Sequence, residues 1–301
     1  MQRLLRARAC VSIVAAMTLV LLAEPLEGAR SAFSPGIAEP LSGLGPRAAE
    51  ASVAAALPPF AMHVASSIDR SRPVPVLIAL HGMGSSGQEM IAPFVAEAER
   101  RGWIVVAPSF TYRDWTDPEQ VRLDESELIP AIRGLLESLP NQVQARVESR
   151  ALVFGFSRGA QLAHRFAFFY PESVRGVVTV GAGTYTLPES QITTDRGNQA
   201  LSFPFGISDL ARYTGRPFDP AALQRVPFLV TVGSDDNRKS DVPHQWDAIE
   251  GTTRVERAQR FVNGLNNIGV NAELRVVPQM DHEVNTAARQ LGCDFLQRSA
   301  N

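Results

Sequence analysis

Apolar runs alternate with segments of helical spacing along most of the chain. Residues 74–80 form a continuous apolar run, which is typical of a strand buried on both faces. Residues 86–101 and 125–139 place apolar side chains three and four positions apart, which predicts amphipathic helices. The same patterns predict further strands at 103–107, 151–156, 174–180, 226–232 and 272–277, and further helices at 160–170, 253–268 and 284–297.

This alternation predicts an α/β fold, in which helices cover both faces of a mostly parallel central sheet. Ligands in such folds bind at the carboxyl ends of the strands. We therefore expect the residues that carry chemistry in the loops that follow the strands. Arg254 and Arg257, in the helix predicted at 253–268, are expected on its solvated face.

The first part of the chain has a different character. Three arginines precede an uncharged apolar run at 11–23, and small residues follow it, which is typical of a secretory signal peptide. The run is short for a membrane span, which needs about 20 residues, although an uncleaved anchor is the alternative. Residues 31–59 are rich in Ala, Pro, Gly and Ser and indicate a linker. We predict a signal peptide at 1–30, a linker at 31–59 and one folded domain at 60–301.

Composition limits the classes of partner. The 301 residues are 45% hydrophobic and 20% charged, as in globular proteins. The net charge is −2, and no run of Lys and Arg occurs beyond the first residues, so no nucleic-acid partner is expected. The sequence lacks a cysteine cluster, a His-Glu-x-x-His motif and a phosphate-binding glycine loop with lysine, so no metal or cofactor is expected.

The segment at 151–160 joins an apolar strand to a helix through Gly155-Phe156-Ser157-Arg158-Gly159. This Gly-x-Ser-x-Gly pattern is typical of a nucleophile elbow, in which a sharp turn holds the serine above the sheet. Bulky side chains in place of the glycines at 155 and 159 would collide in so tight a turn. Ser157 would then lie at a helix N-terminus, where negative charge is favoured. The alternative is an ordinary glycine-rich turn.

A nucleophilic serine needs a base and an acid that orients the base, and in hydrolases these follow in the order serine, acid, histidine. His282 lies just after the last predicted strand, and His244, in a polar loop, is the other histidine late enough in the chain. The preceding strand ends at Gly233. Asp236 is favoured as the acid because hydrolases place it about three residues past that glycine. Asp235 is the alternative.

An oxyanion needs preorganised N–H donors. The expected donors are the backbone amides of Arg158, directly after the serine, and Met83, in the loop His81-Gly82-Met83-Gly84. His81 is expected to support this loop through hydrogen bonds. The Arg158 side chain is expected to pair with an acid on the surface, and contact with a substrate carboxylate is the alternative.

A long insertion at 183–226 separates two predicted strands. Long irregular segments in such positions often form lids or substrate-binding loops. The insertion contains several aromatic residues, and Tyr185 is expected to contact substrate. Tyr112 and Trp115 are expected on the opposite wall. The alternative is that these rings only pack the insertion against the body of the domain.

With these motifs the chain resembles the α/β-hydrolase superfamily. The resemblance covers 60–301 and rests on residues 81–84, 155–159, 235–236 and 282. Within that superfamily the chain resembles secreted bacterial esterases grouped with polyhydroxybutyrate depolymerases, feruloyl esterases and dienelactone-hydrolase-like proteins. Dienelactone hydrolases proper have a cysteine where this chain has a serine.

The resemblance implies a secreted or periplasmic serine esterase, with no stable membrane association once the signal peptide is removed. Ser157 would be the nucleophile, His282 the base and Asp236 the acid, and a small-molecule or polymer ester would be the substrate. Water would be the only co-reactant. The alternatives are an amidase, peptidase or thioesterase on the same triad, or a non-catalytic binding protein on a hydrolase scaffold.

Overall fold

The computed structural model describes residues 57–195 and 197–300. The signal peptide predicted at 1–30 and most of the linker predicted at 31–59 lie outside the described residues. Within the described residues, no helix combines the length and the apolar character that a membrane span requires.

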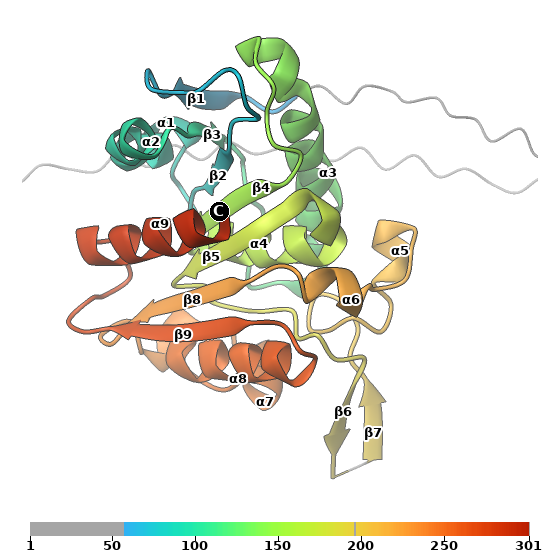
Figure 1. The fold of residues 1–301 in the computed structure, drawn as a ribbon. Helices are drawn as coiled ribbons and strands as arrows, with labels where there is room; N and C mark the ends of the chain where they lie inside the picture. Colours follow the sequence, from blue (N-terminus) through green and yellow to red (C-terminus); the bar gives the residue numbers. More distant parts are fainter. Residues whose placement is uncertain (1–56, 196, 301) are drawn as a thin grey trace, which may run out of the picture. The chain divides into compact units, whose positions relative to one another are not determined.

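A seven-stranded sheet in the order β1-β3-β2-β4-β5-β8-β9 forms the centre of the described part (Figure 1). All neighbouring strands in it are parallel except β1 and β3. The mostly parallel α/β sheet predicted from the apolar runs is therefore confirmed. Its strands are β1 (Phe60–Val64), β2 (Val76–Leu80), β3 (Ile104–Pro108), β4 (Ala151–Phe156), β5 (Val174–Val180), β8 (Phe228–Gly233) and β9 (Ala272–Val277).

Two strands begin later than their apolar runs. Pro75 precedes β2 and Pro227 precedes β8, and proline has no N–H to donate to a sheet ladder. The edge strand β1 has no counterpart in the sequence prediction. Its five residues are half-buried or exposed, so they lack the long apolar run that marks the inner strands.

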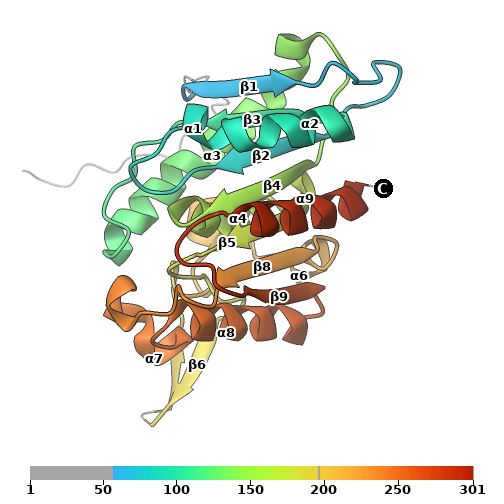
Figure 2. The same ribbon diagram turned by 90° about the vertical axis from the view of Figure 1, so that its left-hand side faces the viewer.

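Helices pack on both faces of the sheet. One core cluster contains side chains from α3, α4 and α8, and the other contains side chains from α1, α2 and α9. Helix α9 lies across β4 and β5 (Figure 2). The long helices are α3 (Pro118–Val143), α4 (Arg158–Phe169), α8 (Arg254–Asn267) and α9 (Thr286–Ala300), and the shorter ones are α1 (Gly87–Ile91), α2 (Val95–Arg101) and α7 (Asp247–Glu250). Single 3₁₀ turns are η1 (Ala92–Phe94), η2 (Pro171–Ser173), η3 (Lys239–Asp241) and η4 (His244–Trp246).

The single helix predicted at 86–101 is two helices joined by η1. Pro93 lies in that 3₁₀ turn. A proline inside an α-helix removes a hydrogen bond and collides with the preceding turn, so the backbone tightens locally.

The insertion at 183–226 is held to the body by its aromatic rings. The ring of Phe203 lies 5.6 Å from that of Phe169 in α4, and Tyr213 lies 5.0 Å from Phe203. These rings therefore pack the insertion against the body of the domain, which is the alternative given in the sequence analysis. The hairpin of β6 (Gln191–Thr194) and β7 (Gly197–Ala200) projects from the body beyond α8 in both views (Figures 1 and 2). The segment ends in α5 (Ala211–Thr214) and α6 (Pro220–Leu223).

The buried face of α3 can be tested by substitution. Leu135 is fully buried against the sheet, whereas Leu123 on the same helix is 47% exposed. Leu135→Ala should lower the free energy of unfolding by about 2–5 kcal/mol because it removes buried apolar contacts and leaves a cavity. Leu123→Ala, the matched control, should change it by less than about 0.5 kcal/mol. Denaturant titration measures both, and equal losses would contradict this assignment of the buried face.

Candidate active site

The turn between β4 and α4 is as sharp as the elbow motif predicts. Ser157 has φ 53° and ψ −116°, and α4 begins at the next residue. A Cβ on Gly155 would lie 2.2 Å from the carbonyl oxygen of Gly159. A Cβ on Gly159 would lie 2.2 Å from the carbonyl oxygen of Leu80 in β2. Both positions therefore require glycine, because no side chain fits between the backbones.

Three predicted side chains form a continuous hydrogen-bonded chain. His282 Nδ1 lies 2.7 Å from Asp236 Oδ2, and His282 Nε2 lies 2.9 Å from Ser157 Oγ. The carboxylate accepts from Nδ1–H, so Nε2 carries the lone pair and accepts from the serine hydroxyl. Asp236 is 1% exposed, whereas the carboxylate of Asp235 accepts from the neighbouring Ser234 hydroxyl. The structure therefore brings Asp236, and not Asp235, to the histidine.

His244 is placed elsewhere. Its side chain is 77% exposed and its Nδ1 lies 2.9 Å from a carboxylate oxygen of Asp247. His282, and not His244, reaches Ser157, so the geometry agrees with the choice of the histidine that lies just after the last strand.

The loop after β2 lies beside the serine. A Cβ on Gly82 would be 3.1 Å from the Cβ of Ser157, so the loop backbone passes directly next to the elbow. His81 holds this loop: its Nδ1–H donates to the Gly82 carbonyl at 2.7 Å, and its Nε2 accepts from the Phe110 amide at 3.0 Å. Burial lowers the pKa of His81, which keeps the ring neutral. Met83 follows Gly82, with a side chain that is 45% exposed.

The Arg158 side chain is buried, which corrects the prediction of a surface pair. Its guanidinium donates to Glu125 Oε1 at 2.8 Å and to Asp124 Oδ2 at 3.1 Å. Arg165 donates to the same Glu125 oxygen, and the ring of Tyr112 lies 5.1 Å from the Arg158 guanidinium carbon. A buried cation requires such partners, and the acids come from α3, which packs beside α4.

Tyr112 and Trp115, predicted on one wall of a substrate site, have different surroundings. Tyr112 is 9% exposed, and its hydroxyl donates to the His81 carbonyl at 3.0 Å. It therefore supports the loop after β2 and does not line a substrate site. Trp115 is half-buried, and its ring lies directly over Gly183, where a Cβ would be 2.5 Å away. Trp115 therefore packs against the start of the insertion and remains partly exposed.

Arg254 and Arg257 are also buried, so the prediction of a solvated face is wrong. Arg254 donates to Asp236 Oδ1 at 2.6 Å, and Arg257 donates to Asp247 at 2.8 Å and to two buried carbonyls. Both arginines precede Phe261 at helical spacing, seven and four positions before it, and therefore share its buried face. That spacing was the signal in the sequence for their burial.

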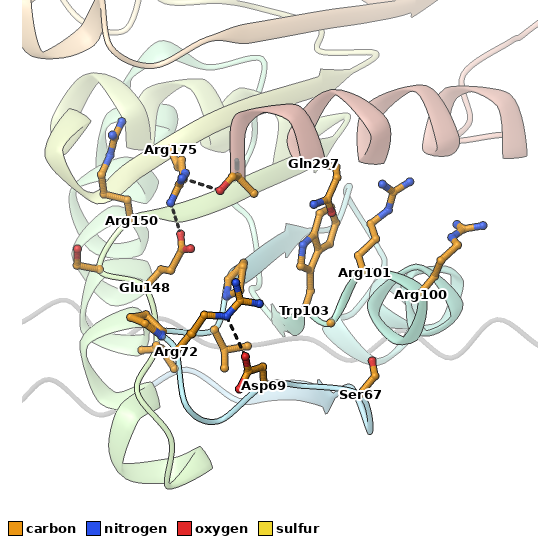
Figure 3. A pocket seen from close by; sticks show the side chains of 17 residues that line it. Ser67, Asp69, Arg72, Arg100, Arg101, Trp103, Glu148, Arg150, Arg175 and Gln297 are labelled. Atoms are coloured by element: carbon orange, nitrogen blue, oxygen red, sulfur yellow. Dashed lines mark hydrogen bonds and ion pairs between the residues drawn. The ribbon is translucent and has the colours of Figure 1, made fainter.

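A large cavity among the described residues lies elsewhere. Its volume is about 900 Å³, and it is lined by residues that precede β2, β3 and β4, at the edge of the sheet opposite the elbow (Figure 3). Arg72 in it pairs with Asp69, and Arg175 pairs with Glu148. Its lining holds no histidine to act as a base, so the hydrogen-bonded triad, not this cavity, is the candidate active site.

No group of three or more His, Cys, Asp and Glu side chains within the described part of the chain could hold a metal ion.

No protein-family model matches the sequence, and no curated protein matches it.

Solved structures do resemble the described fold. Poly(aspartic acid) hydrolase-1 from Sphingomonas sp. KT-1 matches at 18% identity over 79% of this chain and 91% of its own, with a TM-score of 0.60. Esterase PE8 matches at 18% identity over 79% and 97%, with a TM-score of 0.51. A phospholipase/carboxylesterase from Dyadobacter fermentans matches at 16% identity over 79% and 95%, also at 0.51.

These likenesses, together with the sheet order, show that the chain has the α/β-hydrolase fold. The resemblance inferred from the sequence motifs is thus confirmed for the fold.

Tyr185, the third aromatic residue predicted to contact substrate, is 1% exposed, and that prediction is wrong. Its ring stacks on Phe261 with centroids 4.4 Å apart, and its backbone N–H donates to both carboxylate oxygens of Glu250. Burial raises the pKa of Glu250 to about 8, although the nearby charge of Arg257 opposes this.

Glu250 should make stability fall as pH rises. Between pH 4.5, its ordinary pKa, and about pH 8, the folded protein retains a proton that the unfolded chain releases. Glu250→Gln keeps an acceptor for the Tyr185 amide and has no proton to lose. It should therefore be more stable than the wild type at pH 8, by at least about 1 kcal/mol, and similar to it at pH 5.

Thermal unfolding at several pH values measures this difference. Glu137→Gln, at a side chain that is 63% exposed, is the control and should give a small, pH-independent change. A constant difference between Glu250→Gln and the wild type across this pH range would contradict the prediction.

Proposed function

We propose that the chain is an exported serine hydrolase that cleaves carboxylic esters through an acyl-enzyme. The observation that carries the proposal is the unbroken hydrogen-bonded chain from Ser157 through His282 to the buried Asp236. An activated nucleophile is marked by a base within hydrogen-bond reach and a third group that orients the base. Export by the leader predicted at 1–30 is part of the proposal and is supported by the sequence pattern.

In the proposed mechanism each of the three side chains has one task. Ser157 Oγ attacks the ester carbonyl carbon while His282 Nε2, 2.9 Å away, takes the hydroxyl proton. Asp236 holds the imidazole in the tautomer that leaves Nε2 free and stabilises the imidazolium. The proton passes from Nε2 to the leaving alcohol, and a water molecule, activated by the same nitrogen, then hydrolyses the acyl-enzyme.

Two backbone amides are suited to hold the oxyanion. Arg158 is the first residue of α4, and the first four amides of an α-helix have no partner within the helix. The amides of Ala160 and Gln161 already reach the Ser157 carbonyl, which leaves the Arg158 amide available. Met83 supplies the second amide from the loop that passes beside the serine.

Some of the solved structures with this fold are described as an esterase and a phospholipase/carboxylesterase, which supports ester bonds as the substrate class. An amidase, peptidase or thioesterase would use the same three residues. Substrates matched in all but the scissile bond (ester, thioester and amide) separate these activities, and the proposal expects the ester to have the highest kcat/KM.

Ser157→Ala should lower kcat/KM for short-chain p-nitrophenyl esters by at least about 10³-fold, because the nucleophile is gone while the fold is unchanged. Ser126→Ala is the control: that hydroxyl is exposed on α3 and donates to a carbonyl of its own helix. A fluorophosphonate probe should label the wild type at Ser157 and leave Ser157→Ala unlabelled. Equal ester turnover by the wild type and Ser157→Ala would refute the proposal.

Gly181 gives a second test, because it lies against the hydrogen bond between the acid and the base. Its Cβ would be 3.2 Å from His282 Nδ1 and 3.3 Å from Asp236 Oδ2, at a backbone φ of 62°. Gly181→Ala should lower kcat by about 10- to 100-fold, because it moves the imidazole from its position. KM should change much less.

Gly215→Ala is the matched control. Gly215 has a similar φ of 70°, but nothing lies within 4 Å of the position of its Cβ. Both substitutions therefore introduce similar backbone strain, and the Gly181 variant alone crowds the triad. If the two variants lose equal activity, the effect is strain and not displacement of the triad.

A further inference from the structure

The second oxygen of the triad carboxylate is bound by an arginine. Asp236 Oδ2 faces His282, and Asp236 Oδ1 accepts from Arg254 Nη1 at 2.6 Å. Arg254 is 5% exposed and Asp236 is 1% exposed, so the pair is shielded from water. Among the described residues, Arg254 and His282 are the two side chains that donate to this carboxylate.

Arg254 is itself fixed in place. It is the first residue of α8, and its Nη2 donates to the backbone carbonyl of Asp241 at 2.9 Å. Asp241 follows Asp236 in the same loop. One guanidinium thus binds the acid and the loop that carries it, in a geometry that a lysine ammonium reproduces only in part.

Most of the other polar groups around this loop have partners of their own. Arg238 pairs with the carboxylates of Asp241 and Asp281, and Asp281 accepts the backbone N–H of His282. From α7, Glu250 binds the Tyr185 amide. Arg257, one turn along α8, donates to the Asp247 carboxylate and to backbone carbonyls. The Asp235 carboxylate accepts from the Ser234 hydroxyl, and the Tyr185 phenol is buried.

A buried carboxylate is costly in its ionised form unless it is paired. The Asp236 carboxylate must face Nδ1 to hold the histidine tautomer that the proposed mechanism requires. We propose that Arg254 is a positioning residue: it holds the Asp236 carboxylate in the orientation that faces His282, and through Asp236 it sets the orientation of the imidazole. This inference rests on the proposed function, and the opposing view is that Arg254 merely ties α8 to the acid loop.

The test uses the rate of fluorophosphonate labelling of Ser157, with ester kcat and KM measured alongside. Arg254→Met should lower the labelling rate and kcat by about 10- to 100-fold, because the imidazole is no longer held in place. KM should stay within about threefold. Arg254→Lys should recover a large part of the rate, because an ammonium can still pair with Asp236 Oδ1. The final extent of labelling gives the number of folded, reactive sites. The labelling rate of each variant is therefore divided by that number before the variants are compared.

A double-mutant cycle separates positioning from structure. In an Asp236→Asn background there is no carboxylate left to position, so adding Arg254→Met should cause no further loss per labelled site. A structural tie predicts the same fold loss in both backgrounds, and that result would overturn the inference. Arg260→Met is the control on the same helix, since Arg260 pairs with Glu189, and it should label within about twofold of the wild type.

The outcomes for the two proposals differ. If wild-type Ser157 is neither labelled nor needed for ester turnover, the proposed function and the role of Arg254 both fail. If the wild type is labelled and Arg254→Met is labelled at the same rate, the proposed function stands and the role of Arg254 alone fails.

Discussion

Close approach of backbones at the carboxyl edge of the sheet is the constraint on which this structure depends. Three glycines at that edge lie in close contact with atoms of another segment. Gly159 lies against the carbonyl of Leu80, Gly233 lies against the carbonyl of Met280, and Gly181 lies against the triad itself. A Cβ at Gly233 would be 1.9 Å from the Met280 oxygen, so the acid and base loops meet only because no side chain intervenes. The triad distances follow from this backbone packing.

Two buried arginines, each paired with carboxylates, are a second feature of the structure. Arg158 is the first residue of α4 and Arg254 is the first residue of α8, so each places a cation at a helix N-terminus, where the dipole is already positive. Carboxylates offset that unfavourable position. The acids of α3 bind Arg158 beneath the serine, and Asp236 binds Arg254 beside the histidine. The first interaction ties α4 to α3, and the second ties α8 to the segment that carries Asp236.

The sequence predicted what depends on local pattern. Apolar runs marked the inner strands, and the order of motifs indicated Ser157, Asp236 and His282, because each lies within five residues of the end of a strand. It did not predict partners that are distant in sequence. Arg158 binds acids 33 and 34 positions earlier, and no periodicity reveals which carboxylate an arginine meets. For Arg254 the helical spacing with Phe261 indicated a buried position, but the charge of an arginine favoured the wrong prediction of a solvated one.

Aromatic packing also limits what can face a substrate. Tyr185, Phe203 and Phe169 are buried, so those rings of the insertion and of the helix beneath it are used to fasten the insertion to the body. At the carboxyl edge, partly exposed apolar side chains remain on Phe156 and Trp115, and Met83 is exposed. Met83 and Trp115 lie in the loops after β2 and β3, and Phe156 is the last residue of β4, directly before Ser157. Met83 also supplies one of the proposed oxyanion donors. On the proposed function, one set of short loops therefore holds the reacting carbonyl and contacts its apolar substituent, and the insertion serves to brace them.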